Sequence, residues 1–277
     1  MGDLRSDQQA LSVIRLTYGA EKLQFGELHL PTGSASRPHP TVVLIHGGFW
    51  HTPYDYSLMT GLAVDLARRG FATWNIEYRR VGDRGGGWPN TMMDVAMAAD
   101  YLYTVAPMYA LNLQRAVAIG HSAGGHLALW LAARPKIAKK SELAASKHVD
   151  NNHGQLQLAG IISLAGVSDL EMCWRLKLGG GAVANLLGGS PTQLPERYAA
   201  ASPAAMLPLG VPQILIHGTK DDSVPHSMSE SYTRAAQSAG DPIRLITLQG
   251  VEHFALINPN SSAWSATVEA LQTLLPA

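Results

Sequence analysis

Charge and cysteine are both scarce in this sequence, and each shortage narrows what the chain can be. Cys173 is the only cysteine among 277 residues, so an internal disulfide is excluded and we expect this residue to be a small buried side chain. Asp, Glu, Lys and Arg together make up 15 % of the chain, against an average of about 25 %. Acidic and basic residues number 21 each, so no net charge attracts nucleic acid or an anionic membrane. We therefore expect neither of these as a partner.

Long apolar runs and cofactor motifs are absent as well. No run approaches the roughly 18 apolar residues that cross a bilayer, and residues 1–10 lack the apolar core of a signal peptide. These observations predict a soluble, cytoplasmic protein. The sequence contains no H-E-x-x-H, no paired Cys/His spacing, no G-x-G-x-x-G and no P-loop. We accordingly expect no metal and no cofactor.

The sequence does contain a regular alternation of strand-like and helix-like segments. Its length and its 46 % of apolar residues suit one large domain over residues 1–277. Residues 11–30 alternate as a hairpin, and strand-like runs follow at 41–45, 71–78, 116–120, 160–165, 211–217 and 243–248. Helices are expected at 57–69, 90–105, 123–133, 227–239 and 263–275. This order predicts an α/β fold with a mostly parallel, eight-stranded sheet and helices on both faces.

Residues 171–206 depart from this rhythm. Glycine and proline recur through the stretch and leave room only for short helical pieces. Irregular insertions of this length in a compact domain usually serve as lids or binding loops. We therefore predict a small lid-like insertion there.

The strongest single motif is G-x-S-x-G at residues 120–124. A buried apolar strand at 116–119 leads into it, and a helix that starts near Ala123 leads out of it. A turn this tight holds the serine at strained backbone angles, and the flanking glycines remove side chains that would clash. It also sets the positive end of the helix dipole beneath the serine. Ser122 is therefore the predicted nucleophile.

A serine hydroxyl needs a base to take its proton, so the histidines and carboxylates downstream matter. Where this motif carries a triad, the chain order is serine, acid, histidine. His253 lies late in the chain, after the last predicted strand, and is the predicted base. Asp221 and Asp222 compete for the acid, and Asp221 is favoured because it fits a D-x-x-V-P pattern. Glu252 and Asp169 are weaker candidates.

An oxyanion hole is predicted in the H-G-G-F-W segment at residues 46–50, after the strand at 41–45. The tetrahedral intermediate of acyl transfer carries a negative oxygen that requires fixed N–H donors. Two glycines allow the backbone to turn and to approach a ligand closely. The expected donors are the N–H groups of Gly48, Phe49 and Ala123, and His46 is expected to brace the loop.

Together these motifs resemble the esterase/lipase branch of the α/β-hydrolase superfamily. The matching residues are His46, Gly47, Gly48, Phe49 and Trp50, the segment 120–126, Asp221, Val224, Pro225 and His253. The H-G-G-x-W form is similar to that of arylformamidases (kynurenine formamidases) and their bacterial esterase relatives. Hormone-sensitive-lipase-like enzymes usually carry a third glycine where this chain has Phe49. The resemblance implies the α/β-hydrolase fold and triad chemistry.

The N-x-E-Y-R stretch at residues 75–79 is also similar to these relatives. Its carboxylate is interpreted as structural. We expect Glu77 to contact Arg79 or Arg80.

The expected substrate is a small molecule with an apolar or aromatic acyl group. Its pocket is predicted to be lined by Trp50, Trp88, Trp174 and Leu186. The favoured function is a carboxylesterase-type serine hydrolase that cleaves small carboxylic esters through an acyl-enzyme. Two alternatives stay open: an arylformamidase or amidase acting on N-formyl aryl substrates, and a non-catalytic binding protein on the same fold. The sequence leaves the oligomeric state open.

Overall fold

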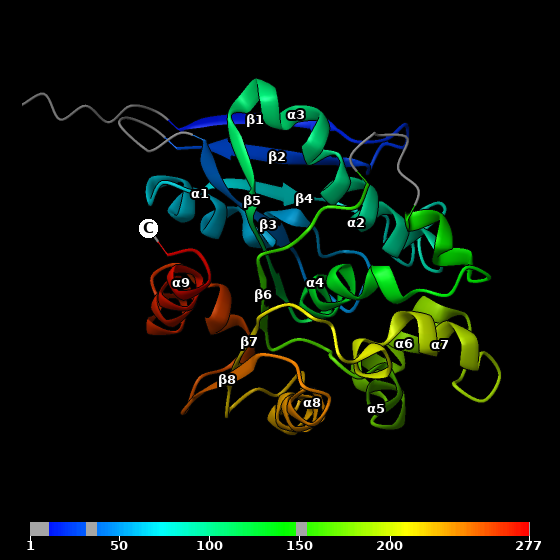
Figure 1. Cartoon of the computed structure of the whole chain (residues 1–277). Coiled ribbons are helices and arrows are strands. Elements are labelled where there is room, and N and C mark those ends of the chain that lie inside the picture. The colour runs from blue at the N-terminus through cyan, green and yellow to red at the C-terminus, as the bar shows by residue number, and fades with distance from the viewer. Residues whose placement is uncertain (1–10, 32–37, 148–153, 277) are drawn as a thin grey trace, which may run out of the picture.

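An eight-stranded sheet runs through the centre of the protein, as the computed structural model of residues 11–31, 38–147 and 154–276 shows (Figure 1). The strands are β1 (Ser12–Thr17), β2 (Phe25–Leu30), β3 (His39–Ile45), β4 (Ala72–Ile76), β5 (Leu111–His121), β6 (Gly160–Leu164), β7 (Gln213–Gly218) and β8 (Ile243–Leu248). Their spatial order is β1-β2-β4-β3-β5-β6-β7-β8. β2 pairs antiparallel with β1 and β4, and all pairings from β4 through β8 are parallel. The predicted fold class and the antiparallel hairpin at residues 11–30 are confirmed.

The strands differ in burial as their position in the sheet requires. Every residue of β3, β4, β6 and β7 is buried, which explains their continuous apolar runs. The edge strand β1 is only partly covered and alternates instead. The register places Ile45 beside Gly120, and Gly120 beside Ser163. The carboxyl ends of β3, β5 and β6 therefore meet at one edge of the sheet.

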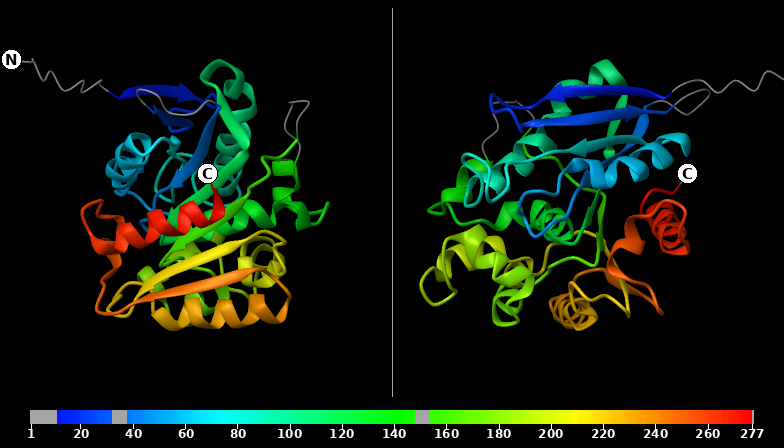
Figure 2. Two further views of the ribbon diagram at one scale, coloured as in Figure 1. Left: turned by 60° about the vertical axis from the view of Figure 1, so that its left-hand side comes forward. Right: turned by 180° about the vertical axis from the view of Figure 1, so that it is seen from behind.

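Helices cover both faces of the sheet. The α-helices are α1 (Thr60–Arg68), α2 (Asn90–Asp100), α3 (Leu102–Tyr109), α4 (Ala123–Ala133), α5 (Leu170–Arg175), α6 (Ala182–Leu187), α7 (Pro195–Ala201), α8 (His226–Ser238) and α9 (Ser262–Leu274). Short 3-10 helices occur at η1 (Tyr56–Met59), η2 (Arg134–Lys136), η3 (Glu142–Lys147), η4 (Leu178–Gly180), η5 (Pro203–Met206) and η6 (His253–Ile257). α1 and α9 bury their apolar side chains on one face, while α2, α3, α4 and α8 cover the other (Figures 1 and 2).

Two segments differ from the sequence-based expectation. Residues 90–105 form parts of two consecutive helices, α2 and α3, which meet at Tyr101. β5 begins at Leu111, five residues before the predicted start. The prediction missed this first half because most of its residues are polar or only partly buried. Such residues do not resemble a buried strand in the sequence. Residues 171–206 contain mainly the short helices α5 to α7, and their role as a lid stays a prediction.

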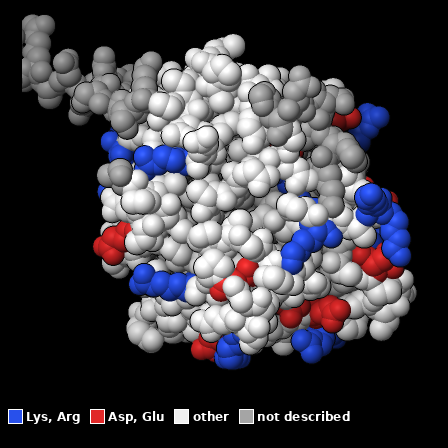
Figure 3. All heavy atoms as spheres, viewed as in Figure 1, with Lys and Arg blue, Asp and Glu red and all other residues white. Residues whose placement is uncertain are grey.

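The surface carries both kinds of charge. On the face seen in Figure 3, Lys and Arg side chains are interspersed with Asp and Glu among many uncharged residues. Within residues 11–31, 38–147 and 154–276, no helix combines the length and apolar character needed to cross a membrane.

Candidate active site

Ser122 occupies the sharp turn between β5 and α4. Its backbone angles are φ 56° and ψ −119°, a conformation in which a side chain is strained. Its neighbours explain why glycines flank it: a Cβ added to Gly120 would lie 2.0 Å from the carbonyl oxygen of Gly124, and one added to Gly124 would lie 2.1 Å from that of Ile45. The chain can make this turn only without side chains at these two positions.

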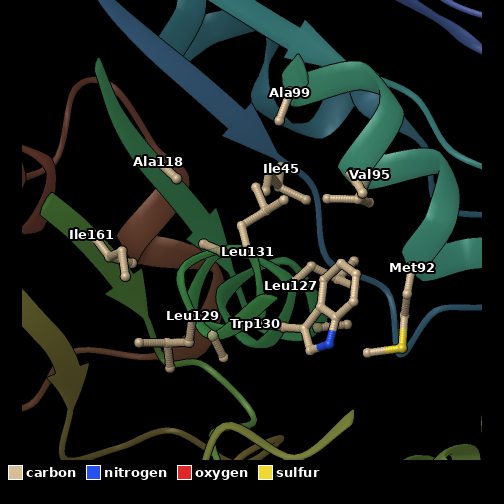
Figure 4. Close-up of a cluster of buried hydrophobic side chains, with 14 of the residues drawn as sticks. Ile45, Met92, Val95, Ala99, Ala118, Leu127, Leu129, Trp130, Leu131 and Ile161 are labelled. Atoms are coloured by element: carbon tan, nitrogen blue, oxygen red, sulfur yellow. The ribbon is translucent and has the colours of Figure 1, made fainter. Parts of the chain in front are cut away.

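The helix that follows Ser122 is anchored in the core. Apart from Ala132, every residue of α4 is buried, in keeping with a helix that is apolar on all sides. Leu127 and Trp130 pack near Ile45 of β3 and Val95 of α2 (Figure 4). This packing fixes the N-terminus of α4, and with it the serine, relative to the sheet.

Asp221 and His253 come from different loops and meet in a short hydrogen bond. His253 Nδ1 lies 2.6 Å from Asp221 Oδ2. Asp221 Oδ1 accepts from the backbone N–H groups of Ser223 and Val224, at 2.9 and 2.8 Å. Asp222 is exposed, and its side chain accepts from the Ser223 hydroxyl. Of the two competing carboxylates, Asp221 is the one that contacts the imidazole.

The other carboxylates considered as triad acids lie in different settings. Asp169 caps the N-terminus of α5 by accepting from the Met172 N–H at 3.0 Å. Glu252 is an exposed residue immediately before η6. Neither has a hydrogen bond to His253 among the described residues.

The Asp221 carboxylate is held in its ionised form. Burial tends to raise its pKa, but the hydrogen bonds from His217 and His253 and from the Val224 N–H outweigh burial and hold the pKa well below its usual range. An ionised carboxylate is an acceptor only. His253 therefore carries its hydrogen on Nδ1 toward Asp221 and leaves Nε2 free to accept a proton.

His121, the residue before Ser122, contacts His253. The Nε2–H group of His121 donates to the His253 carbonyl at 3.1 Å, and the two imidazole rings lie 4.4 Å apart. Burial, reinforced by the neighbouring His253, lowers the pKa of His121 to about 3, so this ring stays neutral. Ser122 Oγ has no hydrogen bond to His253 among the described contacts. Catalytic hydrogen bonds often tighten only when substrate binds.

The loop after β3 lies directly against Ser122. A Cβ added to Gly47 would be 3.0 Å from Ser122 Cβ and 2.7 Å from the His121 carbonyl oxygen. Gly48, Phe49 and the following residue all have positive φ, so their peptide groups turn sharply. Within the described part of the chain, the N–H groups of Gly48 and Phe49 have no hydrogen-bond partner. They are thus available to a ligand oxygen.

The predicted bracing role of His46 has a visible basis. Its Nε2 lies 3.0 Å from Glu77 Oε1, and its ring stacks on Tyr78 with centroids 4.2 Å apart. The Tyr78 hydroxyl donates to the His46 carbonyl at 2.9 Å. Of the two arginines expected near Glu77, Arg80 lies 3.7 Å from it, whereas Arg79 binds Asp94. The buried Glu77 carboxylate thereby ties the loop after β3 to the end of β4.

The four residues predicted to line the pocket have different surroundings. Trp50 is fully buried and donates to Nδ1 of His126 at 3.2 Å, and Leu186 is 1 % exposed, so both pack inside the protein and offer no open surface here. Trp174 is 37 % exposed on α5. Trp88 lines a cavity of about 780 Å³ whose lining includes neither the other three residues nor the serine.

His217 and His121 are the residues that sequence reasoning missed. His217 Nε2 lies 3.1 Å from Asp221 Oδ2, the oxygen that also accepts from His253. The available signal was its position four residues before the acid, at the end of a buried strand. For His121 the signal was adjacency to the serine.

No group of three metal-binding side chains occurs in the part of the chain that the structure describes.

Comparison with known proteins agrees with this architecture. The chain is 25 % identical over 256 residues to a probable isoprenylcysteine alpha-carbonyl methylesterase of Oryza sativa subsp. japonica, covering 90 % of this chain and 57 % of that protein. An Arabidopsis thaliana protein of the same description is 25 % identical over 245 residues, covering 86 % of this chain and 50 % of the relative. The chain thus spans about half the length of the curated relatives it matches.

Solved esterase structures share the fold. A truncated carbohydrate esterase from gut microbiota superposes with a TM-score of 0.80 at 18 % identity, covering 96 % of both chains. A thermophilic esterase from Thermogutta terrifontis gives 0.74 at 22 % identity, covering 95 % of this chain and 91 % of that one. The model of the BD-FAE family matches residues 27–235. The chain therefore belongs to the BD-FAE family of esterase-type α/β-hydrolases.

Proposed function

We propose that this protein is a serine hydrolase that cleaves small carboxylic esters with a triad of Ser122, His253 and Asp221. The observation that carries the proposal is the 2.6 Å hydrogen bond between His253 and Asp221, together with the contact of His253 with His121, which precedes a serine at strained backbone angles. Family membership supports an esterase, and the names of the relatives and fold neighbours consistently describe esterases.

The proposed reaction begins when Ser122 Oγ attacks the ester carbonyl. His253 Nε2 takes the hydroxyl proton, and Asp221 keeps the imidazole in the required tautomer and stabilises the imidazolium. His253 then returns the proton to the leaving alcohol, which leaves an acyl-enzyme on Ser122. Attack by water, with His253 again as base, releases the acid and restores the serine.

The proposed oxyanion hole consists of the N–H groups of Gly48, Phe49 and Ala123. The first two lack partners among the described residues, and the third begins α4, where helix N–H groups have no partner within the helix. Three donors around one position would stabilise the negative oxygen of the tetrahedral intermediate. The proximity of Gly47 to Ser122 supports this arrangement, since it sets the loop beside the nucleophile.

A parallel substrate panel tests the proposal. Wild type and Ser122→Ala should be assayed on p-nitrophenyl acetate and on N-formylkynurenine, with the exposed Ser265→Ala on α9 as matched control. We expect the ester to be cleaved by wild type and by Ser265→Ala but not by Ser122→Ala. Preference for the formamide would favour the arylformamidase alternative. Failure of the wild type to turn over either substrate, or to react with a fluorophosphonate probe, would favour a non-catalytic binding protein.

A further inference from the structure

A second buried histidine faces the acid of the proposed triad. His217 lies in β7 and is 0 % exposed. Its Nε2 lies 3.1 Å from Asp221 Oδ2 and 2.9 Å from the Val224 carbonyl oxygen. Its Nδ1 lies 2.7 Å from the Ser229 hydroxyl on α8. Every polar atom of this ring therefore has a partner.

The partners of His217 determine where its proton resides. Nε2 faces two oxygens that can only accept, the Val224 carbonyl and the ionised Asp221 carboxylate, so Nε2 must carry a hydrogen. Nδ1 faces a hydroxyl, which can donate to it. The direction of hydrogen bonding is consequently from Ser229 to His217 and from His217 to Asp221.

We propose that His217 is a positioning residue that acts through Asp221: its Nε2–H holds the Oδ2 atom that receives His253, and Ser229 sets its tautomer. This inference rests on the proposed triad. One carboxylate oxygen is shared by two imidazoles, so the carboxylate can neither rotate nor concentrate its full charge on His253. His217 thereby fixes the orientation of the base and moderates how strongly the base retains its proton.

Two further imidazoles lie near this cluster. The His121 ring lies 4.4 Å from that of His253, on β5. The His226 ring on α8 lies 5.4 Å from that of His217 and forms an ion pair with Glu230 at 3.3 Å. His226 does not touch Asp221, although it neighbours the same ring. It therefore offers a matched control.

The test compares His217→Leu, His217→Gln and His226→Leu in the full chain. Leucine removes the donor, whereas a glutamine amide nitrogen is the same number of bonds from the backbone as Nε2 and can still donate. For His217→Leu we expect kcat on p-nitrophenyl acetate to fall about tenfold, with KM little changed. The acid limb of its kcat/KM profile should move upward by about half a pH unit, because a carboxylate with one donor fewer retains the imidazolium proton more strongly. His217→Gln should recover most of both effects, and His226→Leu should match wild type.

The inference is overturned if His217→Leu keeps the wild-type kcat and acid limb, or if His217→Leu and His217→Gln lose kcat equally while the acid limb stays in place. Should the leucine variant fail to fold, Ser229→Ala and His217→Gln decide. The inference expects a few-fold lower kcat for Ser229→Ala and near wild-type behaviour for His217→Gln, and the reverse result contradicts it.

Asp221→Asn distinguishes an error in the proposed triad from an error in the role proposed for His217. If this variant stays active, the triad itself is wrong; if it is inactive while His217→Leu is normal, only the role of His217 is wrong.

Discussion

Asp221 and Asp100 are both buried carboxylates with several hydrogen-bond donors, yet their partners differ in kind. Asp100, at the end of α2, accepts from Arg134 at 2.7 and 2.8 Å and from the Leu156 N–H at 2.7 Å. Asp221 accepts from backbone N–H groups and from imidazoles, including His253 at 2.6 Å. In both places burial demands that the charge be matched by donors.

The two carboxylates differ in whether their partner can gain and lose a proton. A guanidinium keeps its charge at every physiological pH, whereas an imidazole gains and loses a proton near neutrality. The pair of Asp100 with Arg134 can therefore join α2 to the end of α4 but cannot take part in proton transfer. The Asp221 carboxylate is matched by hydrogen-bond donors without a fixed positive charge, and one of these partners can change its charge during a reaction. From this contrast we expect one carboxylate to matter for activity and the other for folding.

The largest expected effect is the loss of activity in Asp221→Asn. An asparagine amide at this position can donate to His253 Nδ1 and so stabilise the unproductive tautomer, for which we expect kcat to fall about 10⁴-fold. Ester turnover together with the thermal unfolding midpoint measures this. Asp222→Asn is the matched control, since its side chain accepts only from the Ser223 hydroxyl among the described contacts. Similar losses in both variants would remove the distinction between the two neighbouring acids.

The converse effect is expected for Arg134→Met. Removing the guanidinium leaves Asp100 buried without its main partner, which should lower the free energy of unfolding by about 3–5 kcal/mol. Chemical denaturation measures the loss, and kcat of the folded fraction should stay close to wild type. A large drop in kcat with unchanged stability would contradict the structural role.

The sequence predicted the parts of this account that depend on local pattern. The helix at 123–133 has the predicted bounds because a buried apolar helix follows a strand and a tight turn. Ser122, Asp221 and His253 could be selected because motif, chain order and loop position agree. Asp221 could not be separated finally from its neighbour, because only the folded loop determines which carboxylate turns inward.

Tertiary contacts account for what the sequence did not reveal. The chain has 11 histidines, and the four-residue spacing between His217 and Asp221 does not by itself show that the two side chains meet. Trp50 is one of the aromatic residues that the sequence predicts to line the pocket. In the structure its φ is 58°, and its indole N–H donates a hydrogen bond to His126 inside the core. Pocket shape depends on such inward or outward turns, which residue type alone does not determine.

A smaller effect is expected for Gly47→Ala, which leaves Asp221 and Asp100 unchanged and shifts only the loop beside Ser122. The Cβ of Gly47→Ala would lie 2.7 Å from the His121 carbonyl oxygen, so the loop must shift away from Ser122. Misplacing the proposed oxyanion donors should lower kcat about 100-fold. Gly61→Ala in α1 is the control, since its Cβ would be 3.3 Å from the nearest atom, on Pro259. Equal activity of the two variants would argue against the oxyanion loop.

The smallest expected effect is a pH dependence of stability that belongs to Asp221. Because the pKa of Asp221 is lowered in the folded state, its contribution to stability is complete above the unfolded value near 4 and is lost as the pH falls toward the folded value. The stability advantage of wild type over Asp221→Asn should thus shrink as the pH falls below about 4. Urea denaturation across this range measures it. A difference that stayed constant as the pH fell well below 4 would contradict this assignment.

The most direct test of the central claim is the site and rate of labelling by a fluorophosphonate probe. A serine activated by an oriented imidazole should take the label on the peptide that contains Ser122, as read by mass spectrometry. Labelling should slow at least 100-fold in His253→Ala. A label on another residue, or an unchanged rate in His253→Ala, would contradict the account.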